Sequence, residues 1–339
     1  MTEKITGIRG FNDVLGSESA LWRHIEDEAA SIFTTYGFSE IRLPIVEKTE
    51  LFSRSIGTTT DIVEKEMYTF PDRKDVMLTL RPEGTAPAVR AYIENKLYTQ
   101  PVTRLFYRGP MFRYERPQKG RYRQFYQIGA EVLGDARAHV DAETIEMLVR
   151  LFCKLGLKDT TLEINSLGCN DCRPAYKEAL QSFLSTIKES LCENCVRRID
   201  ENPLRALDCK SAGCIEATEI VPSLSEHICG ECANHFSETK KRLSVLSIAF
   251  KVNPRMVRGL DYYTKTTIEI TSSELGAQNS IAAGGRYDGL VADLGGPDTP
   301  CFGFAIGMER LALLLDDTPS AKLPEESPLI YFISLDETT

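Results

Sequence analysis

The sequence lacks any apolar run long enough to cross a membrane. A membrane-spanning helix takes about 20 consecutive apolar residues, whereas the longest runs here, such as 329–333, have the length of a strand. The first 14 residues also lack the apolar core of a secretion signal. We therefore expect a cytoplasmic protein with no membrane partner.

The chain also lacks an excess of positive charge. Its 40 Lys and Arg residues are outnumbered by 49 Asp and Glu residues, and the formal net charge is -9. This balance argues against a protein that coats nucleic acid non-specifically, but it leaves room for a local basic site. The 339 residues are 42% apolar and 26% charged, which excludes the disordered and fibrous classes.

Familiar catalytic and nucleotide-binding patterns are missing as well. The glycine-bearing segments 284–288 and 303–311 follow neither the Rossmann nor the Walker spacing, which disfavours a doubly wound dinucleotide fold and a P-loop NTPase. The four histidines form no apparent set with Ser and Asp, so we assign no general-base histidine.

The apolar pattern predicts an α+β fold. Apolar residues recur at helical spacing over 17–36, about 142–155 and about 308–315. Strand-like runs lie at 41–45, 76–80, 104–107, 113–115, 123–133, 162–166 and 266–272. Because these runs come in groups rather than in strict alternation with helices, they predict an antiparallel β-sheet flanked by helices.

The composition changes between residues 168 and 250, where the chain is rich in cysteine and poor in aromatic residues. We predict a helical insertion domain over 168–250 between the two parts of a main domain, 1–167 and 251–318. Residues 319–339 combine an acidic, proline-bearing linker with a strand-like run at 329–335. A lone strand cannot bury its faces, so we expect the start of a further, missing domain there.

One segment reverses the sign of the charge. Seven basic residues and one acidic residue lie between Arg104 and Arg123, a local net charge of +6. A solvated hairpin is the simple alternative, but arginines bind phosphate oxygens bidentately and stack on purine rings, which indicates a nucleoside triphosphate site. On the strand that follows, alternate residues share one face, and we expect that face to line a pocket. These residues are Phe125, Gln127, Gly129 and Glu131.

Eight of the ten cysteines crowd into one stretch. They form the pairs Cys169 and Cys172, Cys192 and Cys195, Cys209 and Cys214, and Cys229 and Cys232. Two closely spaced pairs can fill a tetrahedral zinc site, and free structural thiols are the alternative. The pairs can be joined two by two in about three ways, and the sequence does not choose among them. Because they lie outside the other motifs, we expect any zinc to be structural and its loss to leave the chemistry largely intact.

Five motifs, in order, resemble those of class II aminoacyl-tRNA synthetases. Residues 36–57 around Pro44, 112–131 and 303–311 are similar to the three class signatures. Residues 258–264 and 283–287 resemble the two histidine-specific motifs of histidyl-tRNA synthetases, and the resemblance extends over 7–335. It implies a ligase that joins L-histidine to ATP as histidyl-adenylate, releases pyrophosphate, and transfers histidine to the 3′ end of its tRNA.

The resemblance also implies roles for individual side chains. Arg113 and Arg258 would act at the α-phosphate as catalytic residues. ATP, with Mg²⁺, would be bound by Arg113, Glu115, Arg121, Phe125, Arg258 and Arg310. Histidine would be bound by Glu83, Gly84, Thr85, Gln127, Glu131, Tyr262 and Tyr263. Within that set, Glu131 and Tyr263 would contact the two imidazole nitrogens, which discriminates against amino acids that lack them.

The same resemblance implies a cytoplasmic homodimer whose catalytic domain is the main domain, and an anticodon-binding domain of which 319–339 holds the linker and the start. One alternative is the regulatory subunit of ATP phosphoribosyltransferase, a non-catalytic relative with the same scaffold. From that relative we would expect loss of the 258–264 motif, which is intact here. A zinc-stabilised RNA-binding module is a third alternative, but it would not require the charged pocket residues together.

Overall fold

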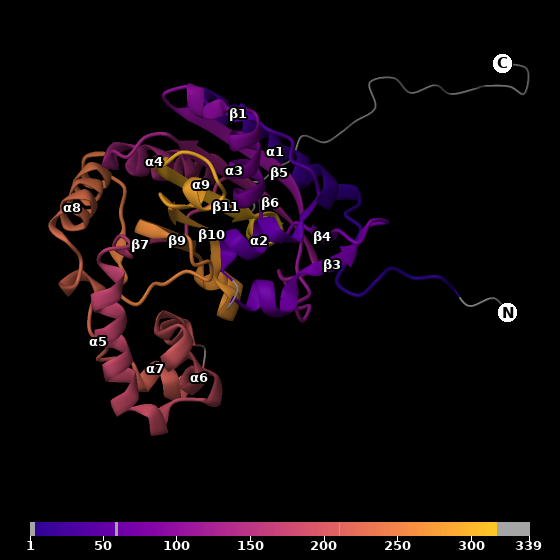
Figure 1. Ribbon diagram of the computed structural model, residues 1–339. Coiled ribbons are helices and arrows are strands. Elements are labelled where there is room, and N and C mark those ends of the chain that lie inside the picture. The colour runs from indigo at the N-terminus through magenta and orange to yellow at the C-terminus, as the bar shows by residue number, and fades with distance from the viewer. Residues whose placement is uncertain (1–3, 58–59, 210, 317–339) are drawn as a thin grey trace, which may run out of the picture.

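A large, mostly antiparallel sheet runs through the molecule in the computed structural model, which describes residues 4–57, 60–209 and 211–316 (Figure 1). The six central strands pair with their neighbours in antiparallel fashion. The two short end strands are parallel to the strands beside them, β1 to β5 and β8 to β7. Across the sheet, the described strands follow the order β1 (Ser39–Glu40), β5 (Thr103–Phe112), β6 (Gln124–Leu133), β11 (Cys301–Gly307), β10 (Ser280–Arg286), β9 (Thr264–Thr271), β7 (Thr161–Ser166) and β8 (Lys251–Val252). This arrangement confirms the predicted α+β class.

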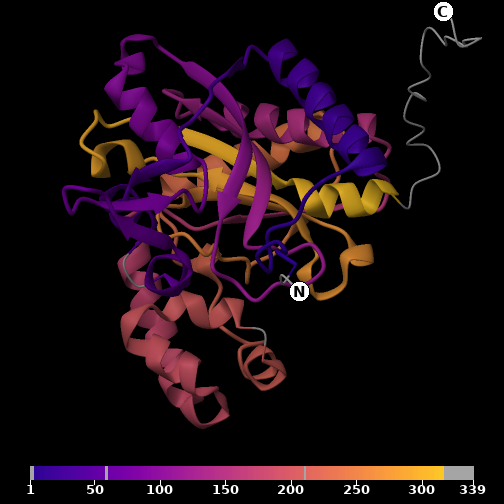
Figure 2. The ribbon, with the colours of Figure 1, turned by 90° about the vertical axis from the view of Figure 1, so that its right-hand side faces the viewer.

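Helices cover one face of this sheet and bury the main core there. They are α1 (Gly16–Thr35), α4 (Ala138–Lys154), α8 (Gly230–Val245) and α10 (Met308–Asp316). Strand β6 directs Ile128, Ala130 and Val132 toward this core, where they join Phe33 of α1 and Leu148 of α4. The alternate residues of β6 therefore face the other side of the sheet. Figure 2 shows α1 and α10 together on the helical side.

The second face carries a smaller unit. A three-stranded antiparallel sheet of β2 (Val46–Lys48), β4 (Met77–Leu80) and β3 (Tyr68–Pro71) lies beside α2 (Thr49–Ile56) and a π-helical turn (Ile62–Glu66). The chain then passes from β4 into α3 (Thr85–Glu94), a 3-10 turn (Leu97–Thr99) and β5. This path carries residues 81–85 to the face of the large sheet that the main core leaves free.

Three helices project from the body, namely α5 (Arg173–Thr186), α6 (Glu193–Glu201) and α7 (Ala212–Ala217), and they lie at the bottom of Figure 1. They are joined by 3-10 turns at Lys188–Ser190, Pro203–Asp208 and Leu224–Glu226. Helix α8 follows them and returns to pack on α4. The boundaries of the predicted insertion domain stay a prediction, and the segments predicted at 319–339 lie outside the described residues.

Two predicted strands are wrong. Residues 41–45 connect the two sheets, because Pro44 has no N–H to donate and the carbonyls of Leu43 and Pro44 accept from the Arg81 guanidinium instead. Residues 113–115 form a tight turn in which the Glu115 amide donates to the Arg113 carbonyl. The remaining short elements are α9 (Leu290–Asp293) and a 3-10 turn (Ser273–Gln278).

Within the three described ranges, the helices are too short or too polar to traverse a lipid bilayer.

Candidate active site

A buried carboxylate lies at the centre of the site, on the free face of β6. Glu131 pairs in register with Gly303 of β11, and its side chain has no exposed surface. Thr85 and Tyr107 donate hydrogen bonds to its Oε1 at 2.8 and 3.0 Å. Tyr287 donates to its Oε2 at 2.6 Å. Strand β6, helix α3, strand β5 and the residue that follows β10 therefore converge on one acceptor group.

Burial raises the pKa of Glu131 to about 7 from its ordinary value of 4.5, although the three hydroxyl donors act in the opposite direction. Burial has this effect because removal of water penalises the charged form of an acid. A carboxyl group that titrates near neutral pH inside a pocket is typical of a functional site rather than of a simple structural contact.

The aromatic ring of Tyr107 fills the space that two glycines leave open. A Cβ atom on Gly84 would lie 2.1 Å from the ring, and one on Gly129 would lie 2.3 Å from it. Neither position has room for a side chain, because real Cβ contacts do not fall below about 3 Å. Gly84, a predicted site residue, therefore acts by leaving room for Tyr107 beside Glu131.

The first turn of α3 holds a second buried carboxylate. Glu83 is 4% exposed, and its two oxygens accept from the backbone amides of Thr85 at 2.6 Å and Ala86 at 2.9 Å. Burial raises its pKa, while these two amides act to lower it. The helix N-terminus therefore partly offsets the effect of burial on Glu83, which lies in the same pocket as Glu131.

Gln127 lies four residues before Glu131 on β6, on the same face of the strand. Its Oε1 atom is buried, and within the described chain it has no hydrogen-bond partner. An unpaired buried amide oxygen costs free energy unless a ligand or water donates to it. This atom is therefore suited to accept from a donor group on a bound molecule.

The segment 258–264 closes the pocket from the side of β9. The Tyr262 and Tyr263 rings are both 7% exposed and lie 4.8 Å apart between centroids. The ring of Tyr262 also lies 5.8 Å from that of Tyr287. Burial raises the pKa of Tyr263 to about 12, so its hydroxyl is a neutral hydrogen-bonding group at neutral pH.

Arg258 lies between the aromatic pocket and the charged end of the site. Its guanidinium carbon is 5.7 Å from the Tyr263 ring centroid, and Nη1 is 3.6 Å from Glu269 Oε1. Its Nε atom is buried and has no hydrogen-bond partner among residues that the structure describes. The guanidinium is therefore held in place while one donor stays available.

The charged end of the site is built around the loop between β5 and β6. Arg113 donates from Nε to the Pro82 carbonyl at 2.9 Å, and its guanidinium carbon lies 5.2 Å from the Phe125 ring centroid. Arg121 makes a close ion pair with Glu115. Burial opposes ionisation of Glu115, but the hydrogen bond from Arg121 and the charge of Arg113 hold its pKa below the ordinary value.

Arg310, in the first turn of α10, also belongs to this charged cluster. It donates to the Ser280 carbonyl at 2.7 Å and the Gly120 carbonyl at 3.2 Å. Burial, followed by the nearby charge of Arg121, lowers the pKa of Arg310. Closely placed guanidinium groups repel one another unless an anion lies between them, so this end of the site is suited to a polyphosphate.

The structure adds residues that the sequence analysis did not select. Tyr107 and Tyr287 both donate to Glu131. Glu66, in the π-helical turn, has its pKa raised to about 7 by burial and by the neighbouring Glu115 carboxylate. Tyr287 lies within the 283–287 motif and could have been selected from it. Tyr107 and Glu66 carry no comparable sequence signal, because only the fold brings them to the pocket.

Behind the pocket, a buried ion pair fixes the end of β10. Arg286 and Asp141 are both completely buried, and their side chains lie 2.7 Å apart. His235 of α8 lies 2.7 Å from the same aspartate. Breaking a buried ion pair by removing one partner typically costs about 3 to 5 kcal/mol. This contact therefore ties α4, α8 and the strand that precedes Tyr287 into one rigid support.

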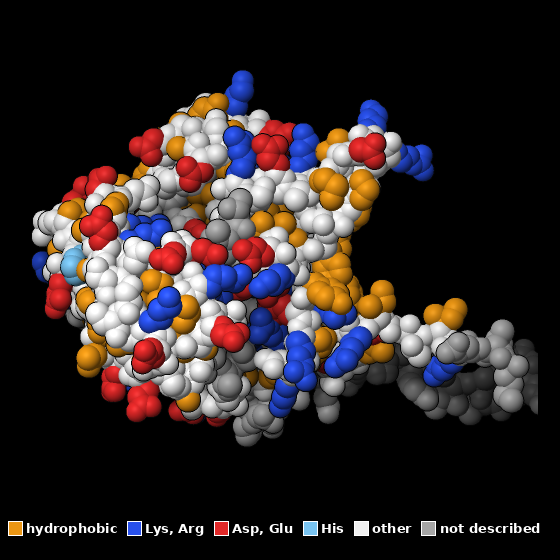
Figure 3. All heavy atoms as spheres, turned by 60° about the horizontal axis from the view of Figure 1, so that its bottom comes forward, with side chains coloured by type: hydrophobic (Ala, Val, Ile, Leu, Met, Phe, Trp, Pro, Cys, Tyr) orange, Lys and Arg blue, Asp and Glu red, His pale blue; other side chains and the backbone are white. Residues whose placement is uncertain are grey.

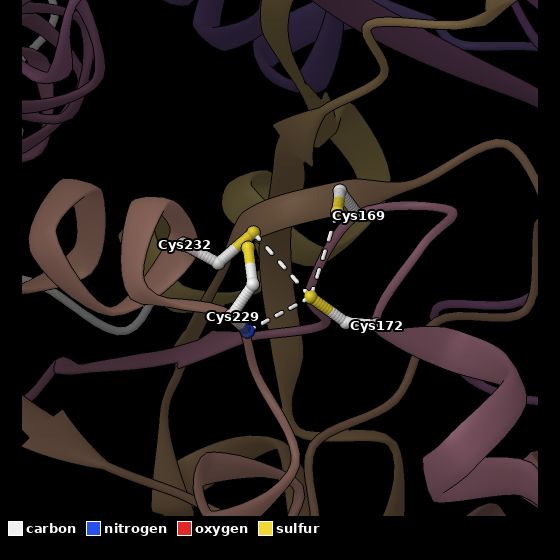
Figure 4. Close-up of side chains that lie close together, drawn as sticks. All are labelled: Cys169, Cys172, Cys229 and Cys232. Carbon is white, nitrogen blue, oxygen red and sulfur yellow. Dashed lines mark hydrogen bonds between the residues drawn. The ribbon is translucent and has the colours of Figure 1, made fainter.

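Among the described residues, the eight clustered cysteines separate into two groups of four. Within each group, the sulfur atoms all lie within 4.8 Å of one another. The first group is Cys169, Cys172, Cys229 and Cys232, whose side chains point toward one another in Figure 4. The second is Cys192, Cys195, Cys209 and Cys214. Each group could hold a metal ion, and all eight cysteines are free of disulfide bonds.

Comparison with known proteins identifies a single family. The model of the family described as histidyl-tRNA synthetase matches residues 10–311. A histidine–tRNA ligase of Trichlorobacter lovleyi is 61% identical over 322 residues, which cover 95% of this chain and 77% of the relative. One of Geobacter metallireducens is 59% identical and is covered to 78%, with 95% of this chain matched.

Solved structures give the same fold. Apo histidyl-tRNA synthetase of S. aureus superposes with a TM-score of 0.75 at 37% identity, over 92% of this chain and 74% of that one. A Bacillus halodurans protein described as an ATP phosphoribosyltransferase regulatory subunit/histidyl-tRNA synthetase has a TM-score of 0.68 at 20% identity, over 93% of this chain and 84% of that one. At that identity the second likeness concerns the fold alone.

Proposed function

This chain belongs to the histidyl-tRNA synthetase family and functions as a histidine–tRNA ligase, and from that premise we propose how its residues divide the work. The buried face of β6 binds L-histidine, and the arginine cluster beside it binds ATP. The observation that carries this proposal is the completely buried Glu131 carboxylate, held by three hydroxyl groups at the centre of the pocket.

In the proposed histidine pocket, Glu131 and Tyr263 bind the two imidazole nitrogens. A carboxylate accepts an N–H, and a neutral phenol can donate to the other nitrogen, so the pair recognises both ring edges. Glu83, Gln127 and Thr85 receive the α-ammonium group, and the unpaired Gln127 oxygen supports this assignment. Gly84 and Tyr262 complete the walls. A site that buries polar groups for one ligand rejects ligands that leave those groups unpaired.

In the proposed ATP site, Phe125 stacks on the adenine ring, and three arginines bind the triphosphate. Arg113 binds the α-phosphate, while Arg121, positioned by Glu115, and Arg310 bind the outer phosphates. Mg²⁺, which enters with ATP, would lower the charge of the triphosphate. The Glu66 and Glu115 carboxylates would hold it, because oxygen ligands suit Mg²⁺. The pKa of Glu66 is raised by burial and then by repulsion from Glu115, and a cation would relieve that repulsion.

Activation proceeds by in-line attack of a histidine carboxylate oxygen on the α-phosphorus. A bond forms between the carboxylate oxygen and the α-phosphorus. At the same time the bond from the α-phosphorus to the α–β bridging oxygen breaks, and pyrophosphate leaves with that electron pair. Negative charge grows on the α-phosphate oxygens, where Arg113 and Arg258 stabilise it. Because the Arg258 guanidinium is already held against Tyr263, little reorganisation is needed when the charge develops.

In the second step, the terminal ribose hydroxyl of the tRNA attacks the acyl carbon of the adenylate and releases AMP. We propose that the chain acts on histidine tRNA as a cytoplasmic homodimer joined through residues 36–57. We also propose that 1–167 and 251–318 form the catalytic domain around the insertion 168–250, with structural Zn²⁺ held by the clustered cysteines and 319–339 leading to an anticodon-binding domain.

The regulatory subunit of ATP phosphoribosyltransferase is the less supported function. Its scaffold alone would explain the likeness at 20% identity. It would not explain 55–61% identity to several histidine–tRNA ligases. It would also not explain why the segment 258–264 places two buried tyrosines beside the buried Glu83 and Glu131 carboxylates.

Histidine-dependent exchange of labelled pyrophosphate into ATP tests the proposal. We expect exchange with L-histidine and little with other amino acids. Exchange that does not depend on histidine, or none at all with intact ATP binding, would contradict it.

A further inference from the structure

We propose that this chain holds two separate zinc ions, each in a four-cysteine site, and that together they fix the segment 259–265 that carries Tyr262 and Tyr263. The root site is defined as Cys169, Cys172, Cys229 and Cys232, and the distal site as Cys192, Cys195, Cys209 and Cys214. The sequence left three pairings open; the structure selects one of them.

The sulfur geometry supports zinc. A tetrahedral ion with zinc–sulfur bonds of about 2.3 Å requires sulfur atoms about 3.8 Å apart. In the root site, Cys172 Sγ lies 3.4 Å from Cys169 Sγ and 3.8 Å from Cys232 Sγ. In the distal site, Cys192 Sγ lies 3.9 Å from Cys209 Sγ. These separations match the edges of such a tetrahedron and are well above the 2.05 Å of a disulfide bond.

Local backbone geometry favours thiolate ligands at both sites. Cys172, Cys192 and Cys229 occupy the N-cap positions of α5, α6 and α8, where the helix dipole stabilises negative charge. The Cys229 amide donates to Cys172 Sγ at 3.0 Å, and the Cys192 amide donates to Cys214 Sγ at 3.1 Å. Such outer hydrogen bonds are the usual support of metal-bound sulfur.

Basic side chains adjoin the root site, where four thiolates and one Zn²⁺ would carry a net charge of -2. Arg173 follows Cys172 directly, and its Nε is buried with no hydrogen-bond partner in the described part of the chain. Lys265 Nζ is instead shared between two carboxylates, at 3.1 Å from Glu231 and 3.4 Å from Asp288, so it does not count toward compensation of this charge. The Arg173 guanidinium next to the cluster lowers the cost of collecting four thiolates, so this side of the site fits a bound metal ion.

The root site is attached to the pocket segment at Asp261 and at Lys265, on either side of the two tyrosines. The Leu167 amide donates to the Lys265 carbonyl, and the Lys265 amide donates to the Gly168 carbonyl, both at 2.7 Å. Arg173 donates to the Asp261 carbonyl at 3.2 Å. Tyr262 and Tyr263 therefore lie between two anchors that both start beside root-site cysteines.

The distal-site cysteines flank a stretch of the insertion that also contacts the segment 259–265. Between Cys195 and Cys209, Asn202 donates to the Asp261 carboxylate at 3.3 Å, and Arg205 donates to the Gly259 carbonyl at 2.9 Å. Arg198 and Arg205 also lie 3.1 and 3.7 Å from the Asp61 carboxylate. Figure 3 shows this lower side of the molecule, where basic and acidic side chains lie next to one another.

With these contacts, the proposal departs from the expectation that zinc loss would leave the chemistry largely intact. The cores of the insertion and of the pocket are also continuous, since Cys195 and Cys214 belong to the same buried cluster as Tyr262, Tyr263 and Tyr287. Without the ions, the loops that anchor 259–265 lose their cross-links. The affinity for histidine should then fall more than the affinity for ATP, because the proposed ATP contacts other than Arg258 lie on the loop 113–123, on β6 and on α10.

Metal analysis of the full chain tests the two sites directly. Protein purified under reducing conditions, without chelator or added metal, should contain about two zinc equivalents by elemental analysis. Replacing Cys172 and Cys232 together with Ser should remove about one equivalent, and so should replacing Cys195 and Cys214. The matched control is Cys153→Ser on α4, an exposed cysteine outside both groups, which should keep both ions.

Zinc below one equivalent in the unaltered chain would overturn the proposal, and so would loss of all zinc from a folded variant of one site. If the variants fail to fold, titration of the unaltered chain with an organomercurial decides the matter. Zinc release should accompany modification of about eight thiols for two ions. If no zinc is released during that titration, the eight cysteines are free thiols and the proposal is wrong.

The effect on the pocket rests on the proposed function and has its own readout. In each folded double variant, KM for histidine in pyrophosphate exchange should rise several-fold more than KM for ATP. Equal changes in the two constants would contradict the role in fixing 259–265 while leaving the metal result untouched. Absence of exchange in the unaltered, zinc-loaded chain would instead contradict the proposed function.

Discussion

Arg258 is positioned by its stacking on Tyr263 and its ion pair with Glu269, and its buried Nε has no hydrogen-bond partner among the residues described. If it stabilises charge that develops in the transition state, its removal should lower kcat with little change in either KM. We expect Arg258→Ala to reduce histidine-dependent exchange about 100-fold or more. Steady-state pyrophosphate exchange at saturating histidine and ATP measures this.

Arg150→Ala provides the matched control for that loss of charge. Arg150 is an exposed arginine of α4 that pairs with Glu146 one turn away, and exposed pairs of this kind contribute little to stability. Its exchange rate should stay close to that of the unaltered chain. A similar loss in the two variants, or a rise in KM alone for Arg258→Ala, would argue against transition-state stabilisation.

Glu131 is the residue for which substitution should separate the two substrates. Glu131→Gln keeps the size of the side chain but replaces an acceptor oxygen with a donor amide, facing three hydroxyl groups and the proposed imidazole. KM for histidine should rise at least about tenfold, which corresponds to about 1.4 kcal/mol, while KM for ATP changes little. Equal shifts in both constants would place Glu131 outside the amino-acid pocket.

The same residue makes a prediction about pH. Because the pKa of Glu131 is raised from 4.5 to about 7 in the folded chain, the folded state binds more protons than the unfolded state between those values. Its contribution to stability therefore falls as the pH rises through this window, by up to about 3 kcal/mol. Glu131→Gln, which does not titrate, should gain stability relative to the unaltered chain from pH 5 to pH 8.

Denaturant unfolding of both chains at several pH values tests this, because the other titrating groups cancel in the difference. A difference in unfolding free energy that is constant with pH would show that Glu131 is ionised throughout, with an ordinary pKa. The sign matters as much as the size, since a difference that moved the other way would require a lowered pKa.

Single residues show what the sequence could and could not predict about the site. The motifs selected Glu83, Glu131 and Tyr263 from local patterns, and the fold brings them to one pocket, although their roles stay predictions. Tyr107 could not be selected, because its contact with Glu131 depends on two small positions in distant elements, Gly84 and Gly129. Chemistry that resides in a motif is visible in the sequence, whereas space left for another side chain is not.

Among the elements, strand β11 has the strictest requirement, because it passes directly behind the buried carboxylate. A Cβ on Gly303 would lie 1.7 Å from Glu131 Oε2 and 2.7 Å from the Ala130 carbonyl oxygen. Gly303→Ala must therefore displace Glu131 or push the strand away, and overpacking of this kind costs about 1 to 3 kcal/mol. We expect a lower unfolding temperature and a large rise in KM for histidine.

Gly307, on the same strand, offers the matched substitution. A Cβ there meets no atom closer than 3.8 Å among the described residues. Gly307→Ala should keep an unfolding temperature near that of the unaltered chain. Equal destabilisation by the two alanines would mean that the backbone conformation of β11, rather than the contact with Glu131, excludes a side chain.

The elements also show why some secondary structure was predicted and some was not. Helix α4 was expected from its apolar periodicity, although it begins at Ala138 rather than near residue 142. The strand expected at 41–45 failed because alternation of apolar residues does not reveal that Arg81 takes the carbonyls of Leu43 and Pro44. Periodicity reports burial, but a strand also needs a neighbour for its backbone.

At the scale of the whole molecule, the insertion and the pocket should influence each other reciprocally. If the zinc sites restrain 259–265, histidine bound to that segment must in turn stabilise the sites, because coupling between two ligands is symmetric. We expect saturating histidine to raise the affinity for zinc several-fold, measured at equilibrium in competition with a strong chelator. A colorimetric zinc indicator measures how the zinc divides between the chain and the chelator.

Free histidine itself binds Zn²⁺, so the comparison needs a chain that experiences the same solution without filling the pocket. Glu131→Gln serves this purpose, since it keeps all eight cysteines and should bind histidine weakly. Protection in the unaltered chain but not in this variant is the expected result. Equal zinc affinities in both, with and without histidine, would show that the insertion and the pocket are independent.

The order of the strands bears on how the protein is made. Strand β6 lies between β5 and β11, yet the ribosome synthesises the whole insertion after β6 and before β9, β10 and β11. Throughout that interval the nascent chain has a β6 edge with unpaired backbone groups, and Glu131 has neither Gly303 nor Tyr287 beside it. Unpaired sheet edges invite pairing with other chains. The strand that completes the pocket is therefore also the one that ends the period in which the growing chain is most open to aggregation.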